Sequence, residues 1–284
     1  MTPFSDTKNK QAGCLILAGG QGTRLGIDGP KGCVTLPIKE KKTLFQILLE
    51  KVKDVKASIA IMTSPLNHEA TLLYLKKNDF FGLENVTLFQ QEMEGGYPNG
   101  NGKAFALLHA LGIYDDWKKK GIESVQVLPV DNPLATPFDA ELLRANEDVD
   151  LALRVVEVKN PDEKIGRVVG GRILKVHEYI DTDIPPKAKW GNTGIFSCKM
   201  DFIYRIYSLK TPTHEVKKKI NNEWVSKKEY FIFDLFPYAK TFQLILSKRS
   251  LHFSPLKNAS GSESFTTVMK DLAQLKGLLL NQTL

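Results

Sequence analysis

The sequence predicts an α/β protein with a doubly wound, mostly parallel sheet and a smaller mixed α+β portion that carries substrate contacts. Three observations lead to this fold class. Short apolar runs alternate with helix-like segments through the first half of the chain. The first of these runs ends in a glycine-rich stretch, Gly19 to Gly32. After residue 150 the pattern changes to short strands, a hairpin signal and one long terminal helix.

The first half of the chain alternates in the order βαβαβ-loop-α-β. Runs of consecutive apolar residues indicate strands that are buried on both faces, and apolar residues at helical spacing indicate the helices between them. Thr43 is expected to cap the first helix. The expected strands are 13–18, 57–63, 86–89 and 124–130, and the expected helices are 43–52, 68–78 and 103–111.

The second half has a mixed, partly antiparallel pattern. Gly170-Gly171 predicts a hairpin with a two-residue turn between the strands 167–169 and 173–176. The aromatic segment 230–239 is expected to belong to the core. Further strands are expected at 150–158 and 194–197, and helices at 200–207 and 265–280. The change in pattern divides the chain into the halves 1–150 and 151–284.

Composition limits the class of protein. The 284 residues are 42% hydrophobic and 25% charged, which suits a packed core and excludes a mainly disordered or low-complexity chain. No apolar run approaches the length of a transmembrane helix, and the N-terminus lacks a signal-peptide core. Three cysteines without CxxC spacing indicate reduced thiols. We therefore expect a cytoplasmic protein with no membrane partner.

The net charge of +7 permits an anionic partner. No aromatic RNA-binding motif and no zinc finger accompanies this charge. A phosphate-bearing small molecule explains the charge as well as a nucleic acid does, so no nucleic-acid partner is expected. The five histidines are scattered, which makes a zinc site unlikely on spacing alone.

The strongest chemical signal is the run Leu17-Ala18-Gly19-Gly20-Gln21-Gly22-Thr23-Arg24-Leu25-Gly26, followed by Pro30-Lys31-Gly32. Glycines allow backbone N–H groups to approach phosphate oxygens, and Arg24 and Lys31 add positive charge. The dinucleotide pattern GxGxxG fails because Leu25 stands where its third glycine is required. The Walker pattern is also absent. The loop therefore predicts a phosphate site of another kind.

This loop resembles the signature of the UDP-sugar pyrophosphorylases, and the resemblance is closest to the eukaryotic type that makes UDP-N-acetylglucosamine. Further segments match in order along the chain, so the resemblance covers roughly residues 13 to 270. The matching segments are Ile61-Met62-Thr63-Ser64, Phe89-Gln90-Gln91-Glu92-Met93, Pro98-Asn99-Gly100-Asn101-Gly102, Val130-Asp131-Asn132, Gly191-Asn192, Phe231-Ile232-Phe233-Asp234-Leu235-Phe236 and Ser254-Pro255-Leu256-Lys257-Asn258.

The resemblance implies the reaction of UTP with a sugar 1-phosphate to give a UDP-sugar and pyrophosphate, with Mg²⁺. N-acetylglucosamine 1-phosphate is the first expectation and glucose 1-phosphate the alternative, because Asn192 is followed by Thr193-Gly194. A nucleotide-sugar-binding protein without catalysis is the alternative from another class. The chain looks like a minimal catalytic core, with a nucleotide-binding half (1–150) and a sugar-binding half (151–284). The oligomeric state stays open.

The resemblance also assigns roles around the phosphates. Arg24, Lys31 and Lys257 are expected to hold and neutralise the reacting phosphates, as catalytic residues. Asp131 is expected to bind Mg²⁺, which prefers carboxylate oxygen. From the residues alone, Asp131 can instead cap a turn, and Lys257 can be a solvated side chain. The glycines expected to face the nucleotide are Gly19, Gly20 and Gly22.

Other roles concern the base and the sugar. Gln91 and the backbone of Gly100 are expected to read uracil, which offers one N–H donor and carbonyl acceptors. Asn101, Glu178 and Asn192 are expected to contact the sugar or ribose. Read as residues alone, Gln91 can be a surface amide and Glu178 an exposed carboxylate. The segment around Gly100 can be a hairpin turn, although a loop that leads into a helix is preferred.

Overall fold

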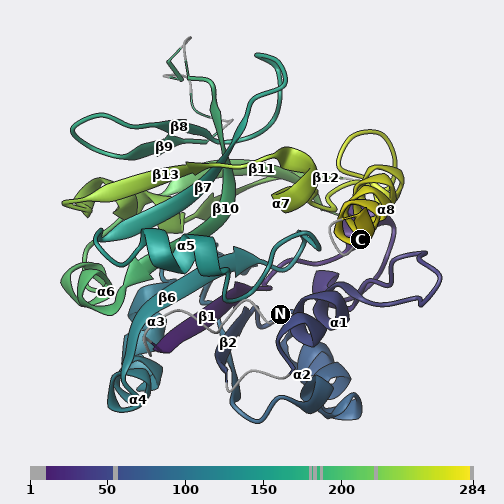
Figure 1. Cartoon of the computed structure of the whole chain (residues 1–284), viewed down its shortest axis with the longest axis horizontal. Helices are drawn as coiled ribbons and strands as arrows, with labels where there is room; N and C mark the ends of the chain where they lie inside the picture. Colours follow the sequence, from purple (N-terminus) through teal and green to yellow (C-terminus); the bar gives the residue numbers. More distant parts are fainter. Residues whose placement is uncertain are drawn as a thin grey trace.

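A central sheet organises the molecule in this computed structural model, which describes residues 11–53, 57–178, 181, 184–185, 188–220 and 223–281. Within these residues the sheet has nine strands, seven of them in the order β13-β7-β10-β6-β1-β2-β3, with β8 paired to β10 and β9 to β8 (Figure 1). The strands are β1 Gln11–Leu17, β2 Ser58–Thr63, β3 Val86–Gln90, β6 Ile122–Pro129, β7 Leu151–Glu157, β8 Arg167–Val169, β9 Lys175–His177, β10 Trp190–Lys199 and β13 Phe242–Leu246.

Strand direction confirms the predicted mostly parallel sheet. β1 pairs in parallel with β2 and with β6, and β2 pairs in parallel with β3. β13 and β7 are also parallel, whereas β10 runs antiparallel to both β6 and β7. Strand β10 thus joins the strands of the two halves of the chain into one sheet. All of the parallel strands consequently end at the same edge of the sheet.

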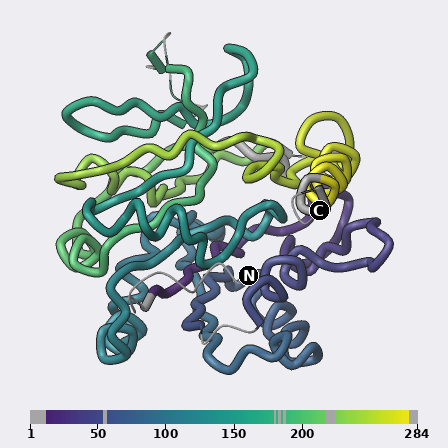
Figure 2. Tube along the Cα trace, viewed as in Figure 1, coloured from purple at the N-terminus to yellow at the C-terminus, as the bar shows by residue number. Residues whose placement is uncertain are grey.

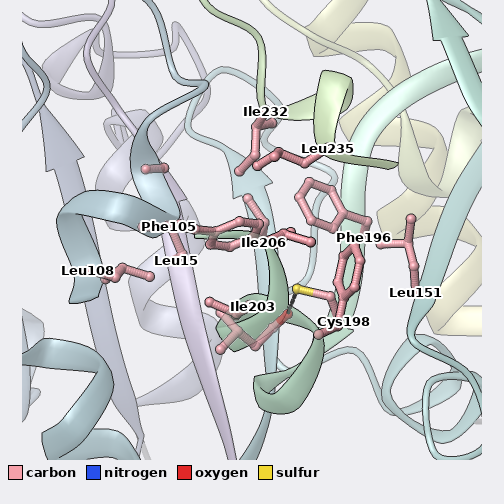
Figure 3. Close-up of a cluster of buried hydrophobic side chains, with 14 of the residues drawn as sticks. Leu15, Phe105, Leu108, Leu151, Phe196, Cys198, Ile203, Ile206, Ile232 and Leu235 are labelled. Atoms are coloured by element: carbon pink, nitrogen blue, oxygen red, sulfur yellow. Dashed lines mark hydrogen bonds between the residues drawn. The ribbon is translucent and has the colours of Figure 1, made fainter. Parts of the chain in front are cut away.

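Helices cover both faces of this sheet because the central strands are apolar on both sides. Cys14 and Ile16 of β1 point into one core with helices α1, α2 and α5, while Leu15 points into the other with α3, α4 and α6. Figure 3 shows part of the second core, where Phe105 of α3 lies beside Leu15 and Ile203 of α6 belongs to the same cluster. The helices are α1 Leu44–Leu49, α2 His68–Lys77, α3 Ala104–Ala110, α4 Ile113–Lys119, α5 Ala140–Ala145 and α6 Met200–Ile206.

A third cluster joins the C-terminal helix to the region of the glycine-rich loop. Leu25 and Val34 of that loop region pack with Leu256 and with Val268 of α8 (Phe265–Asn281). Figure 2 shows this C-terminal helix, in yellow, next to the early part of the chain in purple and blue. The loop that is expected to hold phosphate therefore packs against the C-terminal part of the chain.

Several local predictions are confirmed. The Oγ1 atom of Thr43 accepts a hydrogen bond from the backbone of Gln46 at 3.1 Å, so Thr43 caps α1. The aromatic segment forms a 3-10 helix, η5 (Ile232–Tyr238), and buries Leu235 and Phe236 in the core. None of the described helices is long and apolar enough to cross a membrane.

The predicted two-residue turn at Gly170-Gly171 is wrong. Val169 pairs with Lys175, so five residues, 170–174, connect β8 and β9. Leu174 is fully buried, and Gly170 lies against Phe242 of β13. A tight turn would lift Leu174 out of the core, so burial of this side chain widens the loop.

Other elements were not predicted. Helices α4 and α5 and strand β13 are short, and an antiparallel ribbon of β11 (His214–Ile220) and β12 (Glu223–Glu229) is dominated by polar residues. Strand β10 is longer than the expected 194–197, and a bulge interrupts its pairing with β7 between Asn192 and Phe196. Gly194 adopts φ +73° in that bulge, a conformation that favours glycine.

Candidate active site at the carboxyl edge of the sheet

The predicted nucleotide residues gather where the parallel strands end. Gly19 and Gly20 follow β1, Gln91 follows β3, and Asp131 follows β6. Asn192 reaches the same edge from the antiparallel strand β10, where it pairs with Val155 of β7. Ligands of open α/β sheets bind at this edge. The sheet thus brings together residues as far apart in the chain as Gly19 and Asn192.

The glycine-rich loop closes on itself. The backbone N–H of Lys31 donates to the carbonyl of Gly20 at 3.0 Å, and that of Gly22 donates to Gly29 at 2.9 Å. The Asn67 side chain, which is buried, donates to the carbonyls of Ala18 and Gly20 at 3.0 and 3.1 Å. The Asn67 contacts fasten the loop to the segment that connects β2 with α2. They give its glycines a defined conformation.

The two predicted cations of the loop lie in different surroundings. Lys31 begins a short 3-10 helix and is buried, whereas Arg24 lies in the preceding 3-10 turn and is exposed. The Nζ atom of Lys31 lies 3.1 Å from Oδ2 of Asp131. Their side chains are only 11% and 17% exposed, so each charge is held mainly by the other. The structure therefore joins a predicted phosphate ligand to the predicted metal ligand.

The end of β6 is tied to the C-terminal part of the chain. The carbonyl of Asp131 accepts from the backbone of Leu256 at 2.8 Å. Asn132 is buried, and its side chain donates to the carbonyl of His252 and accepts from the backbone of Ser254. Lys257 directly follows Leu256, so these bonds hold the backbone at Lys257 close to Asp131, the predicted metal ligand.

The donor set at Asp131 suits one kind of cation site. The described part of the chain holds no cluster of three or more His, Cys, Asp or Glu side chains that could bind a metal. Within these residues, no metal site is therefore built from three or more such side chains. Mg²⁺ usually binds one or two carboxylates together with water and substrate phosphates. Asp131 is a single, partly buried carboxylate beside a glycine-rich loop that is expected to bind phosphate. It therefore fits a Mg²⁺ site that is completed by water and substrate phosphates.

Gln91 packs directly on the glycine-rich loop. It is 8% exposed, and its backbone N–H donates to Thr63 at 2.8 Å. A Cβ atom on Gly19 would lie 2.8 Å from Oε1 of Gln91. Glycine is thus required at position 19 for the amide to lie where it does. This burial excludes the interpretation of Gln91 as an ordinary surface amide.

The loop around Gly100 is pressed against the segment between β12 and η5. Gly100 has φ +87°, and a Cβ atom there would lie 2.5 Å from the carbonyl oxygen of Tyr230. The Gly102 N–H donates to the same carbonyl at 2.9 Å. Asn101 accepts from the backbone of Ile232 at 3.0 Å, which fixes the plane of its carboxamide. This is a loop that leads into α3, as preferred from the sequence, and not a hairpin turn.

The predicted sugar-side residues come from the second half. Asn192 is 8% exposed, and its Oδ1 accepts from the backbone of Gly194 across the bulge at 2.9 Å. Lys257 forms an ion pair with Glu263 at 3.0 Å. It is therefore a paired, half-buried side chain and not a freely solvated one.

Glu178 follows β9 and is half-buried. Burial, and secondarily the nearby charge of Asp181, raise the pKa of Glu178 to about 7, while His214 and Lys257 oppose that rise. Its backbone N–H donates to Oδ2 of Asp181 at 2.9 Å. Glu178 and Lys257, which are 79 positions apart, thus act on each other electrostatically.

Two charged side chains near Glu178, His214 and Asp234, were not predicted as site residues from the sequence. Nε2 of His214 lies 2.9 Å from Oδ2 of Asp234, and both side chains are mostly buried. Asp234 lies inside one of the segments that carry the family resemblance, which could have drawn attention to it. His214 carried no such signal, because it belongs to a strand that the sequence did not predict.

Comparison with known proteins adds independent information. A family model described as UTP--glucose-1-phosphate uridylyltransferase matches residues 90–260, and one described as MobA-like NTP transferase domain matches residues 14–163. UDP-N-acetylglucosamine diphosphorylase 2 of Arabidopsis thaliana is 33% identical over 88% of this chain and 62% of its own length. UDP-N-acetylglucosamine pyrophosphorylase of Saccharomyces cerevisiae is 29% identical over 92% of this chain and 68% of its own.

Comparison with solved structures finds proteins with similar names to those of the sequence relatives. The uridine diphosphate N-acetylglucosamine pyrophosphorylase of Trypanosoma brucei, solved with an inhibitor, matches with a TM-score of 0.79 at 27% identity. That match covers 93% of this chain and 65% of the other. The chain thus spans about two thirds of the length of these relatives.

Proposed function

Because the chain belongs to the family of UTP--glucose-1-phosphate uridylyltransferases, we propose that it transfers a uridylyl group from UTP to a sugar 1-phosphate. The products are a UDP-sugar and pyrophosphate. The observation that carries the proposal is the buried pair of Lys31 and Asp131. It joins the glycine-rich loop to the end of β6, at the edge where α/β sheets bind their ligands.

The reaction calls for positioning and charge neutralisation. A phosphate oxygen of the sugar 1-phosphate attacks the α-phosphorus of UTP, and the bond from that phosphorus to the oxygen bridging to the β-phosphate breaks. Pyrophosphate leaves with the electron pair. Several negative charges meet, so cations and backbone donors lower the barrier, and no covalent nucleophile of the protein is needed. Mg²⁺, when bound, would neutralise phosphate charge at Asp131.

We assign the phosphate contacts to the loop and to the C-terminal segment. Lys31 and the exposed Arg24 neutralise the triphosphate, and the backbone N–H groups of the loop donate to it. Lys257 reaches the phosphates from the second half, and exchanges Glu263 for a phosphate oxygen as it does so. Support for this role comes from its place after Leu256, which is bonded to the backbone of Asp131.

We assign the base and the sugar to neighbouring loops. Gln91 and the Gly100 backbone read uracil, and both are held rigidly by the contacts described above. Asn101, Glu178 and Asn192 contact the sugar or ribose hydroxyls. A defined carboxamide plane at Asn101 and Asn192 supports this assignment, since preorganised polar groups select between similar ligands.

N-acetylglucosamine 1-phosphate is the sugar that we propose first, because the similar proteins from plant, yeast and trypanosome carry N-acetylglucosamine in their names. Glucose 1-phosphate is the second candidate, supported by the description of the family model. The three cysteines are free thiols, which suits the cytoplasm. We expect small-molecule substrates and no specific binding to nucleic acid or to membranes.

The test supplies purified protein with UTP, Mg²⁺ and, separately, the 1-phosphates of N-acetylglucosamine, glucose and galactose. Release of pyrophosphate is measured in each mixture. Release with N-acetylglucosamine 1-phosphate supports the proposal in full, and release with another sugar alone changes only the substrate. A protein that binds UTP but releases no pyrophosphate with any of them is instead a nucleotide-binding protein without this catalysis.

A further inference from the structure

The loop around Gly100 is bonded along its length to residues 227–232 of the second half. The backbone N–H of Tyr230 donates to the carbonyl of Asn99 at 2.8 Å, and the N–H of Gly102 donates back to the carbonyl of Tyr230 at 2.9 Å. Both bonds join backbone groups, so they do not depend on which side chains stand there. A side chain of the same segment adds a third bond, and that bond does depend on the residue.

The third bond comes from Lys227 of β12. Its Nζ atom donates to the carbonyl of Pro98 at 3.0 Å and forms an ion pair with Glu229 at 2.5 Å. The side chains of Lys227 and Glu229 are only 8% and 11% exposed. The next lysine, Lys228, is exposed, as lysines usually are. Lys227 thus differs from its neighbour in being buried at a contact between the two halves of the chain.

The bond to Pro98 acts where the approach to the loop is weakly held. Among the described strands, β5 (Tyr97–Pro98) pairs with β4 (Met93–Glu94) and lies outside the central sheet. A two-stranded ribbon of this kind is only marginally stable on its own. Pro98 stands two residues before Gly100, whose backbone has φ +87°. A buried charged hydrogen bond at Pro98 therefore restrains the chain directly before the glycine of the loop.

We propose that Lys227 is a positioning residue for the nucleotide base: its buried ammonium group anchors Pro98 and so holds the Gly100 loop in the conformation that reads uracil. This inference rests on the proposed uridylyl transfer and on the Gly100 backbone as a reader of uracil. Lys227 itself need not touch the substrate. A buried ion pair is often no more stabilising than an apolar pair, so the pairing with Glu229 alone does not account for a lysine at this position.

The central experiment compares the single variant Glu229→Gln with the double variant Lys227→Met/Glu229→Gln. Glutamine keeps the size of Glu229 and can still accept a hydrogen bond from Lys227, so the single variant keeps the bond to Pro98. The double variant removes that bond without leaving a buried charge unpaired. The measurements are KM for UTP, KM for the sugar 1-phosphate, and the ratio of kcat/KM for UTP to that for CTP.

The expected result is a selective loss at the base. The apparent affinity of a ligand falls with the fraction of molecules in the binding-competent conformation. Loss of a hydrogen bond to a charged group shifts an equilibrium by about tenfold or more. Relative to Glu229→Gln, the double variant should therefore raise KM for UTP about tenfold and leave KM for the sugar phosphate within about twofold.

The preference for UTP over CTP separates positioning from a merely structural role. Uracil carries an N–H donor at N3 where cytosine carries an acceptor, and a loop held in one conformation distinguishes the two. The preference should therefore fall in the double variant and stay at the wild-type level in Glu229→Gln. A general loss of stability lowers the amount of folded protein but does not change which base the folded protein prefers.

Two further variants complete the design. Lys227→Arg keeps a positive charge and N–H donors, so it should restore most of the affinity for UTP and the preference for UTP over CTP. The matched control is Lys228→Met, which makes the same substitution at the exposed neighbour on the same strand. It should leave both KM values and the base preference unchanged. Equal effects of Lys228→Met and the double variant would overturn the assignment to Lys227.

The outcomes distinguish the two levels of the argument. A wild type that releases no pyrophosphate with any sugar phosphate contradicts the proposed function. Titration calorimetry with UTP then still tests Lys227, because binding needs no turnover, and a wild type that does not bind UTP overturns both. An active wild type whose KM for UTP and base preference are the same in Glu229→Gln and the double variant contradicts the positioning role alone. A double variant that raises both KM values equally, with the base preference unmoved, also overturns the inference.

Discussion

At the scale of single residues, Asp131 is the most direct test of the site. Replacing it with asparagine keeps its size, removes the charge that faces Lys31, and deprives a divalent cation of its carboxylate ligand. We expect turnover to fall at least about 100-fold, as for loss of one strong charge-stabilising group. The matched control is Asp201→Asn, which removes a surface ion pair with Lys118. Equal turnover in wild type and Asp131→Asn would remove Asp131 from the reaction.

The raised pKa of Glu178 should make the stability of the fold depend on pH. This effect does not depend on the proposed reaction. Its folded-state pKa of about 7 lies above the ordinary value of 4.5. The folded form therefore holds this proton more tightly than the unfolded form, and stability is lost as pH rises through that window. At pH 8 the loss reaches at most about 3 kcal/mol.

Glu178→Gln should accordingly raise the free energy of unfolding at pH 8, by up to about 3 kcal/mol. The gain should shrink toward zero as pH approaches 4.5. Urea denaturation at several pH values measures this, with the exposed Glu147→Gln as the control. A gain that is independent of pH, or a loss at pH 8, would show that the surroundings of Glu178 do not disfavour its charge.

At the scale of elements, the loop before α3 depends on close packing against the β12–η5 connection. An alanine at Gly100 would meet the carbonyl oxygen of Tyr230 at 2.5 Å, at a φ of +87°. The loop must move, so we expect Gly100→Ala to raise KM for UTP about tenfold or more and to lower stability by more than 1 kcal/mol. Gly171→Ala, where a methyl group meets open space, is the control. An unchanged KM for UTP would show that the loop around Gly100 does not bind the uracil base.

Some strands could be predicted from the sequence and others could not. The strands before Gly19 and Asp131 were predictable because each is an apolar run buried on both faces and ended by a polar or glycine signal. The β11–β12 ribbon was not, because its consecutive lysines and few apolar residues give no alternating apolar pattern. His214 was lost with it. The turn at Gly170-Gly171 misled because local turn preference was overruled by burial of Leu174.

At the scale of the whole molecule, one buried arginine connects the two halves of the chain. Arg154 of β7 is 1% exposed and contacts Asp139 before α5 at 2.7 Å and Ser247 after β13 at 2.8 Å. Arg154→Leu would leave Asp139 buried without its partner, so we expect a loss of about 3–5 kcal/mol. Denaturation measures this, with the exposed Arg144→Leu as the control. A loss below 1 kcal/mol would mean that Asp139 is solvated in solution.

The whole molecule also limits what the sequence alone can predict. The halves 1–150 and 151–284 are expected to bind nucleotide and sugar respectively, yet their strands form one sheet through the pairing of β6 with β10. Contacts such as the ion pair of Lys31 with Asp131 join positions far apart in the chain. Spacing along a sequence cannot give such contacts, and only the family resemblance suggested that these residues belong together.

The most direct test of the account is the reverse reaction with labelled pyrophosphate. Wild-type protein is mixed with UDP-N-acetylglucosamine, Mg²⁺ and ³²P-pyrophosphate, and labelled UTP is measured. We expect labelled UTP to form only with a divalent cation, and its formation to be lost in Asp131→Asn but not in Asp201→Asn. Failure of the wild type to form labelled UTP from either UDP-N-acetylglucosamine or UDP-glucose, although it binds UTP, would contradict uridylyl transfer at this site.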